Sequence, residues 1–172
     1  SDFARMPKPI FKNNDLIKLM NENIKLLQKL DETIDIKLNF NEEKIIFNSD
    51  KEQLSRVFLN LIKNSIESIH QKSENNSNFP KKINIEINKF DDNININIID
   101  NGIGFGKFAK NIKDIVNPYF TTKKNGTGLG LSIVNKIIND HNGKIGFIPI
   151  NDGAKVNIYF DLNDSRNINS WR

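Results

Sequence analysis

Three glycines within five residues stand directly before a long helical segment. They form the run Gly126-Thr127-Gly128-Leu129-Gly130, and the helix is expected over residues 131–141. Free N–H groups at a helix N-terminus, together with the positive end of the helix dipole, bind phosphate well. A purely structural reason for three glycines at this spacing is hard to find. We therefore predict that this segment binds phosphate groups.

A carboxylate at the end of a predicted strand precedes a second glycine cluster, Asp100-Asn101-Gly102-Ile103-Gly104. Such a carboxylate can accept a hydrogen bond from an exocyclic amine such as adenine N6, and glycines let the backbone approach the ring. Guanine would place a carbonyl oxygen there, so the contact would select adenine. A simple Asp-Asn-Gly turn at the end of a strand would have the same sequence. The motif alone therefore does not decide between an adenine contact and a turn.

Two asparagines, Asn60 and Asn64, lie one helical turn apart beside the apolar face of a predicted helix. Neutral amide oxygens suit a hard cation such as Mg2+ that also holds phosphate oxygens. Taken alone, the pair is explained more simply as surface asparagines in an asparagine-rich chain. Support for a metal site at this pair comes only from the other segments.

The loop from Pro118 to Lys123 combines an aromatic pair with polar residues and is followed by Lys124. The aromatic pair could anchor a mobile lid, and either lysine could reach a phosphate as a point charge. A loop fixed by one phenylalanine in the core explains the same residues. The sequence leaves the choice of lysine open.

Other common catalytic arrangements are missing. The chain has no cysteine and only two histidines, His70 and His141, which stand at helix ends without an acidic residue at triad or metal-ligand spacing. We interpret both as cations that stabilise a helix dipole. The phosphate loop with a Gly-Lys-Ser/Thr ending is absent, and Gly102 to Gly106 lacks the third glycine of a dinucleotide fingerprint.

The elements that must position these residues follow a regular order. Helices are expected over about 15–30, 50–70 and 131–141, with Asp15 and Asp50 as N-caps, Gln53 completing a capping box, and Gly143 as the last C-cap. Strands are expected at 34–40, 45–47, 83–87, 94–98, 145–150 and 156–160, with a short helix near 112–116. Paired strands separated by single helices predict a two-layer α/β sandwich, in which helices cover one face of a mixed, mostly antiparallel sheet.

Composition narrows the class of protein. The net charge is +4, but the lysines are spread along the chain, which favours a solvated surface over nucleic-acid binding. No apolar run approaches the length that spans a bilayer. We therefore expect a cytoplasmic domain, and we leave open whether the parent protein is anchored in the inner membrane.

Taken in order, the four segments resemble the N, G1, F and G2 boxes of sensor histidine kinases, within the GHKL ATPase superfamily. The matching residues are Gln53-Leu54 with 60–65, then 100–105, 118–123 and 126–132. Residues 1–7 are similar to the exit from the dimerisation helices of nitrogen-regulation-type (NtrY-like) kinases. The resemblance implies a linker at 1–14, a catalytic ATP-binding domain at 15–161 and a tail at 162–172.

The resemblance also implies what the site does. ATP would bind with Mg2+ under a flexible lid, and its γ-phosphoryl would pass to a histidine for two-component signalling. Asn64 would hold Mg2+ with help from Asn60, as the catalytic pair, and Asp100 would accept from adenine N6 above Gly102 and Gly104. The other implied ATP-binding residues are Phe120, Thr121, Lys123, Gly126, Thr127, Gly128, Leu129, Gly130 and Leu131.

The chain departs from the family pattern in three ways. ATP-hydrolysing relatives carry Glu where this chain has Asn60, which favours a kinase over an ATPase. Many histidine kinases place Lys-Tyr in the segment after Asn64, where this chain has Ser65-Ile66-Glu67-Ser68, so a phosphate-facing lysine is missing from that helix. Neither histidine has the context of a phosphoacceptor, so this chain should bind ATP without phosphorylating itself.

The expected partners follow from the resemblance. They are the upstream dimerisation domain with its acceptor histidine and the receiver domain of a response regulator. The fragment should be a monomer and the full-length protein a homodimer. A non-catalytic ATP-sensing domain and a GHKL-type ATPase are the alternatives.

Overall fold

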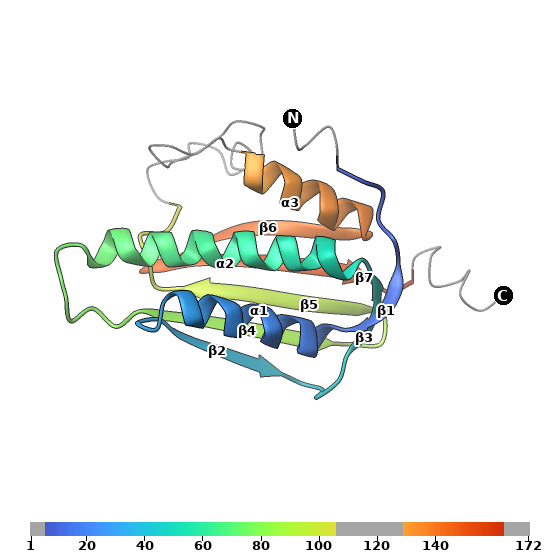
Figure 1. Ribbon diagram of the computed structural model, residues 1–172, viewed down its shortest axis with the longest axis horizontal. Coiled ribbons are helices and arrows are strands. Elements are labelled where there is room, and N and C mark those ends of the chain that lie inside the picture. Colours follow the sequence, from blue (N-terminus) through green and yellow to red (C-terminus); the bar gives the residue numbers. More distant parts are fainter. Residues whose placement is uncertain (1–5, 106–128, 164–172) are drawn as a thin grey trace.

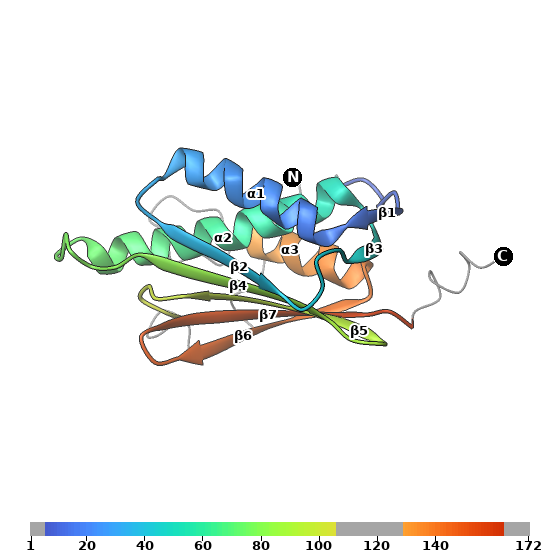
Figure 2. The same ribbon diagram turned by 90° about the horizontal axis from the view of Figure 1, so that it is seen from below.

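The computed structural model describes residues 6–105 and 129–163 as two layers, a five-stranded sheet with helices on one face (Figures 1 and 2). The strand order is β2-β4-β5-β7-β6. This confirms the predicted α/β sandwich. The elements are β1 Lys12–Asp15, α1 Leu16–Leu30, β2 Asp35–Phe40, β3 Ile46–Ser49, α2 Lys51–Ser73, β4 Lys82–Lys89, β5 Asn93–Asp100, α3 Leu129–Asp140, β6 Gly143–Ile150 and β7 Gly153–Asp161.

Alternation along the strands decides which face of the sheet the helices cover. In β5 the isoleucines Ile94, Ile96 and Ile98 are almost fully buried, while the asparagines between them lie on the opposite face. There Asn97 donates to Glu86 and accepts from Asn157 across the strands. The core therefore lies between the sheet and the helices, and the outer face is polar. All neighbouring strands pair antiparallel except β2 with β4.

Two strands near the N-terminus differ from expectation. β1 pairs antiparallel with β3 in a separate two-stranded sheet, although no strand was expected before residue 15. The strand at 45–47 therefore does not join its predecessor β2. Ile45 bonds instead to the start of α1, where its carbonyl accepts from the Leu16 N–H at 2.8 Å. Short strands of this kind carry little periodicity, so their partners are set by tertiary contacts.

Only one of the two hydrogen bonds of the predicted capping box forms at the N-terminus of α2. The Asp50 side chain accepts from the Gln53 N–H at 3.0 Å. A capping box would return the Gln53 side chain to the Asp50 N–H, but Gln53 Nε2 donates to the Pro7 carbonyl. The Asp50 N–H instead donates to His141 Nε2 at 3.0 Å. The head of α2 is thus bonded to the N-terminal segment and to the end of α3.

The interpretation of His141 as a helix-terminal cation is wrong. This side chain is fully buried, and its Nδ1 lies 2.8 Å from the Ile137 carbonyl, to which it must donate. Its Nε2 accepts from Asp50, so the ring is the neutral Nδ1–H tautomer. The ring of Phe11 meets it edge-on at 5.1 Å. His70, in the last turn of α2, lies 2.6 Å from the carboxylate of Asp31.

The turn after α3 corrects a second detail. Asn142, with φ 56°, takes the left-handed conformation after the helix, and Gly143 already belongs to β6. Asparagine adopts this conformation more readily than most residues. Gly143 is required for a different reason, because a Cβ there would lie 2.8 Å from the Tyr159 carbonyl oxygen of β7.

Replacing His141 with phenylalanine is expected to lower the free energy of unfolding by about 1–3 kcal/mol. The ring volume is kept, but the Asp50 N–H loses its acceptor, and an unpaired buried donor carries that penalty. Urea unfolding measures the change. His70→Gln is the matched control, with an expected loss below ~1 kcal/mol because this side chain is 44% exposed. Equal losses in the two variants would contradict the role given to His141.

Among the described helices α2 is the longest, with 23 residues. Neither it nor the others carries the apolar stretch that crossing a membrane would need.

Candidate functional site

Asp100 is the last residue of β5 and lies on the face of the sheet that the helices cover. The residue is only 6% exposed. Burial raises its pKa above the ordinary value. Hydrogen bonds from the Gly102 N–H, the Ser65 side chain and the Ala154 N–H act against this rise, as does the charge of Lys72. The result is a desolvated acceptor with a fixed orientation, which suits an amine donor on a flat ligand.

The glycine loop after Asp100 is pressed against α2 on one side and the β6–β7 turn on the other. A Cβ on Gly102 would lie 2.7 Å from the Ser68 carbonyl carbon and 2.8 Å from Ile69 N, both backbone atoms. Gly104 has φ 76°, and a Cβ there would lie 2.7 Å from the Gly153 carbonyl oxygen. Both predicted glycines are therefore needed for close approach, and Gly104 also for its backbone conformation.

Asn101 within the same motif has a structural role. Its side chain donates to the Pro80 carbonyl at 2.6 Å and accepts from the Lys82 N–H at 3.1 Å. It thereby joins the end of β5 to the start of β4. The motif combines a loop that can face a ligand with a residue that holds the sheet.

Asn60 and Asn64 lie on α2 as predicted, both half-buried at the edge of the apolar face. Both therefore belong to the helix that covers the sheet beside Asp100 (Figure 1). In the described residues no group of three or more acidic or histidine side chains could hold a metal ion. Two amide oxygens supplemented by phosphate oxygens fit Mg2+, which keeps several ligands from water and substrate.

The phosphate-binding segment is described only where α3 begins. The helix starts at Leu129 rather than at 131, and Gly130 in its first turn is exposed, with open space around it. Leu131 is half-buried and packs against the core. The short helix expected at 112–116, the side chain of Leu129 and the tail from 164 lie outside the described part of the chain. The same holds for the other predicted site residues, which are Phe120, Thr121, Lys123, Lys124, Gly126, Thr127 and Gly128.

Four residues that contact the Asp100 loop were not predicted. Ser65, Ser68 and Lys72 reach it from α2, and Gly153 reaches it from the β6–β7 turn. The helical spacing of the first three was visible in the sequence, but their partner loop lies about 30 residues further along the chain. The contact of Gly153 depends on strand pairing, which sequence patterns do not reveal.

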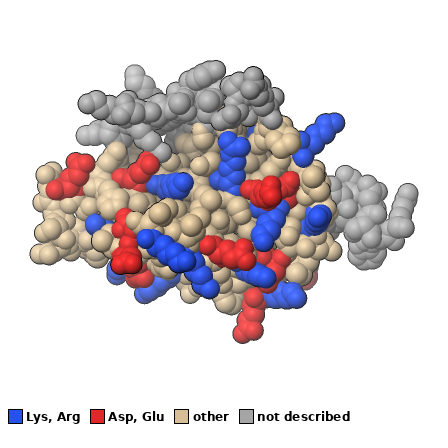
Figure 3. Space-filling model, in the orientation of Figure 1, with Lys and Arg blue, Asp and Glu red and all other residues tan. Residues whose placement is uncertain are grey.

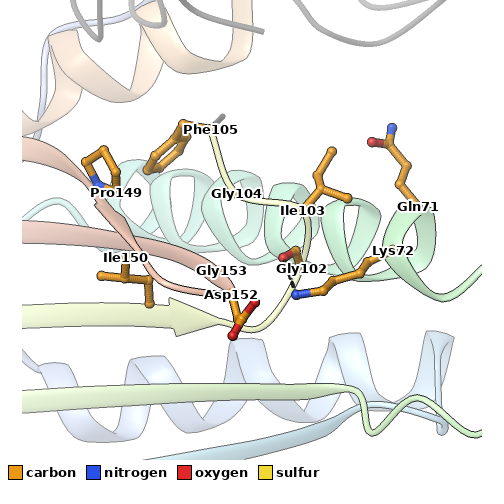
Figure 4. A pocket seen from close by; sticks show the side chains of 10 residues that line it. All are labelled: Gln71, Lys72, Gly102, Ile103, Gly104, Phe105, Pro149, Ile150, Asp152 and Gly153. Atoms are coloured by element: carbon orange, nitrogen blue, oxygen red, sulfur yellow. Dashed lines mark hydrogen bonds between the residues drawn. The ribbon is translucent and has the colours of Figure 1, made fainter. Parts of the chain in front are cut away.

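A hollow of about 620 Å3 opens at this end of the molecule. Figure 4 shows it between the C-terminal half of α2, loop 102–105 and the β6–β7 turn. Phe105 lies on one of its walls and meets the buried Phe147 edge-on at 5.7 Å. Loop 102–105 is thus backed by α2 and exposed toward open space.

The charged side chains do not form one basic surface on the face that Figure 3 shows. Lysine and arginine alternate there with aspartate and glutamate over the helices. A nucleic-acid groove would concentrate one sign of charge. This view supports the expectation of a solvated surface.

Comparison with known proteins gives a family match and several relatives. Residues 49–164 match the family model described as histidine kinase-, DNA gyrase B- and HSP90-like ATPase. An NtrY-like sensor histidine kinase of Rickettsia bellii is 32% identical over 94% of this chain. The nitrogen regulation protein NtrY of Azorhizobium caulinodans is 30% identical over 84% of it.

Solved structures of histidine kinases share the fold of this chain. The nucleotide-free catalytic domain of histidine kinase ThkA superposes with a TM-score of 0.75 at 28% identity, covering 89% of this chain and 96% of that domain. ThkA has also been solved in complex with the response regulator protein TrrA, where the match covers 42% of the kinase chain. By contrast, this chain spans 25% of the Rickettsia protein and 18% of the Azorhizobium protein.

Proposed function

Because this chain belongs to the family of histidine kinase-, DNA gyrase B- and HSP90-like ATPases, we propose that it is the catalytic, ATP-binding domain of a sensor histidine kinase. One observation carries most of the proposal. The buried carboxylate of Asp100 stands beside a glycine loop, next to the helix that bears Asn60 and Asn64. A base, a metal and phosphates can be held together at such a place.

Each part of the site has a distinct role. Asp100 accepts a hydrogen bond from adenine N6, while Gly102 and Gly104 allow the ring to approach the backbone. Asn64, with Asn60, would hold Mg2+, and bound Mg2+ would neutralise part of the charge of the phosphates. The free N–H groups at the start of α3 would bind phosphate oxygens. The domain therefore acts by positioning and charge stabilisation.

The chain's own histidines support a kinase that needs another domain. His141 is fully buried and neutral, and His70 is paired with Asp31. Neither is placed to receive a phosphoryl group, so the acceptor belongs to the upstream dimerisation domain of the parent protein. Asn60 also lacks the carboxylate that would activate water, which favours transfer to an imidazole over hydrolysis.

The parent protein would work in the cytoplasm as a homodimer and pass the phosphoryl group to a receiver domain. The complex of ThkA with TrrA supports a response regulator as the partner. The isolated domain is proposed to be a monomer, with the domain proper at 15–161 and residues 1–14 leading from the dimerisation helices.

The test restores the upstream helices and follows labelled phosphate from ATP to histidine. We expect acid-labile phosphohistidine in the extended protein and none in the 172-residue chain. Asn64→Ala in the extended protein should abolish the label. Binding of ATP without any label would favour a non-catalytic ATP sensor, and steady phosphate release by the chain alone would favour an ATPase.

A further inference from the structure

Helix α2 carries a row of polar side chains that extends beyond the two asparagines. Ser65, Ser68 and Lys72 are spaced three and four residues apart, so they share one face over two turns. Ser65 is buried, and the other two are half-buried against the loop that follows β5. The residues that the family resemblance assigns to binding ATP or Mg2+ do not include these three.

Each member of the row bonds to a different part of the loop. The Ser65 side chain bonds to the Asp100 carboxylate. Ser68 Oγ accepts from the Ile103 N–H at 2.9 Å. Lys72 Nζ donates to the Gly102 carbonyl at 3.2 Å (Figure 4). The helix thus contacts three of four consecutive loop residues.

Lys72 is oriented before any ligand binds. Its ammonium group lies 5.3 Å from the centre of the Phe79 ring, over which it is held by cation–π attraction. From that place it also acts on Asp100, whose pKa burial raises and the charge of Lys72 lowers. Among the described residues, Lys72 supplies the positive charge that lowers the pKa of Asp100. The acidic Asp152 of the β6–β7 turn lines the same hollow as Lys72.

We propose that Ser65, Ser68 and Lys72 form a positioning ridge that sets the purine selectivity of the nucleotide site. The ridge fixes the Asp100 carboxylate and the loop above it at the distance and angle that an adenine amine requires. The proposal rests on the function proposed above, because it needs adenine to bind at Asp100. Hydrogen bonds weaken steeply with poor geometry, so a loosened glycine loop would lose selectivity before it loses phosphate binding.

The experiment is a thermodynamic cycle between the ridge and the amine of the ligand. Calorimetry measures the Mg2+ complexes of ATP and of purine riboside triphosphate, which lacks only the N6 amine. In the unchanged chain we expect removal of the amine to weaken binding roughly 10- to 100-fold, as for a charge-assisted hydrogen bond. In the combined variant S65A/S68A/K72M the same removal should weaken binding less than about 3-fold.

Controls separate positioning from simple loss of structure. A structural defect would weaken both ligands equally and leave the ratio unchanged. Lys72→Arg should restore much of the ratio lost in Lys72→Met, because it keeps the charge and donors. Ser73→Ala, whose hydroxyl bonds to the His70 carbonyl of its own helix, and Lys25→Met on the exposed side of α1 should keep the full ratio.

The outcomes distinguish the two proposals. An unchanged chain that binds neither ligand, or both equally, overturns the adenine site and the ridge with it. An unchanged chain that prefers ATP, with the same preference in the combined variant, overturns the ridge alone. Loss of the preference in the variant, with a retained thermal unfolding midpoint, supports the ridge.

Discussion

Asp100→Asn is expected to weaken ATP binding by about 100-fold and to abolish the preference for ATP over GTP. The asparagine oxygen would keep the hydrogen bond from the Gly102 N–H, which lies 2.9 Å from Asp100 Oδ1. Its NH2 group would then face the adenine amine, donor against donor. A lost charge-assisted contact and an unpaired polar group each weaken binding by about tenfold or more. Calorimetry with both nucleotides measures the change.

The same substitution acts on the fold in two opposing ways. Burial raises the folded-state pKa of Asp100, so its contribution to stability is present below the unfolded pKa and lost as pH rises through the folded pKa. Ionised Asp100 therefore opposes folding at neutral pH, and Asn removes that cost. The Asn NH2 group would nevertheless face a donor, because Gly102, Ser65 and Ala154 all donate to the carboxylate. The unfolding temperature of Asp100→Asn, relative to the unchanged chain, should therefore be higher at neutral pH than near the ordinary pKa of 3.8. An equal difference at the two pH values would contradict this account of the buried carboxylate.

Acid titration of binding gives an independent check. ATP affinity should fall as pH falls through the pKa of Asp100, above the ordinary 3.8, because the protonated carboxyl loses its charge. Asp100→Asn lacks that step. The difference between the two pH profiles isolates Asp100 from protons that ATP itself takes up.

Much of the fold could be predicted because its strongest signals are local. Isoleucines alternating with asparagine in β4 and β5, and the apolar stripe of α2, each arise from neighbours within one element. The errors concern groups whose partners are distant. The pairing of β1 with β3, the neutral ring of His141 and the second bond of Gln53 depend on segments 31 to 91 residues away.

The site divides in the same way. Asp100, Gly102 and Gly104 form a contiguous motif, so neighbouring residues in the sequence were enough to select them as candidates. The residues that hold this motif come from α2 and from the β6–β7 turn, and serines or lysines on a helix give no sign of which loop they face. Gly153 begins β7, and its contact with Asp100 follows only from the order of β5 beside β7.

Gly153→Ala is expected to damage the site from outside any nucleotide motif. A Cβ there would overlap the Asp100 carbonyl oxygen and lie 3.0 Å from the Asp100 carbonyl carbon and 3.2 Å from Asn101 Cα. These are backbone atoms, so the end of β5 or the turn must move. Overpacking of this kind lowers the free energy of unfolding by about 1–3 kcal/mol. Because Asp100 must shift, ATP affinity should fall by about tenfold or more, as a displaced hydrogen bond requires.

Gly146→Ala is the matched control, because it adds the same methyl group to the neighbouring strand β6. A Cβ at Gly146 meets nothing within 4 Å, and alanine should be neutral or slightly stabilising in a strand. Urea unfolding and ATP calorimetry on both variants separate backbone crowding at Asp100 from a general effect of losing a glycine. If Gly153→Ala bound ATP like Gly146→Ala, the β6–β7 turn would not position Asp100. A loss confined to Gly153→Ala would show that the turn and α2 hold the loop from opposite sides.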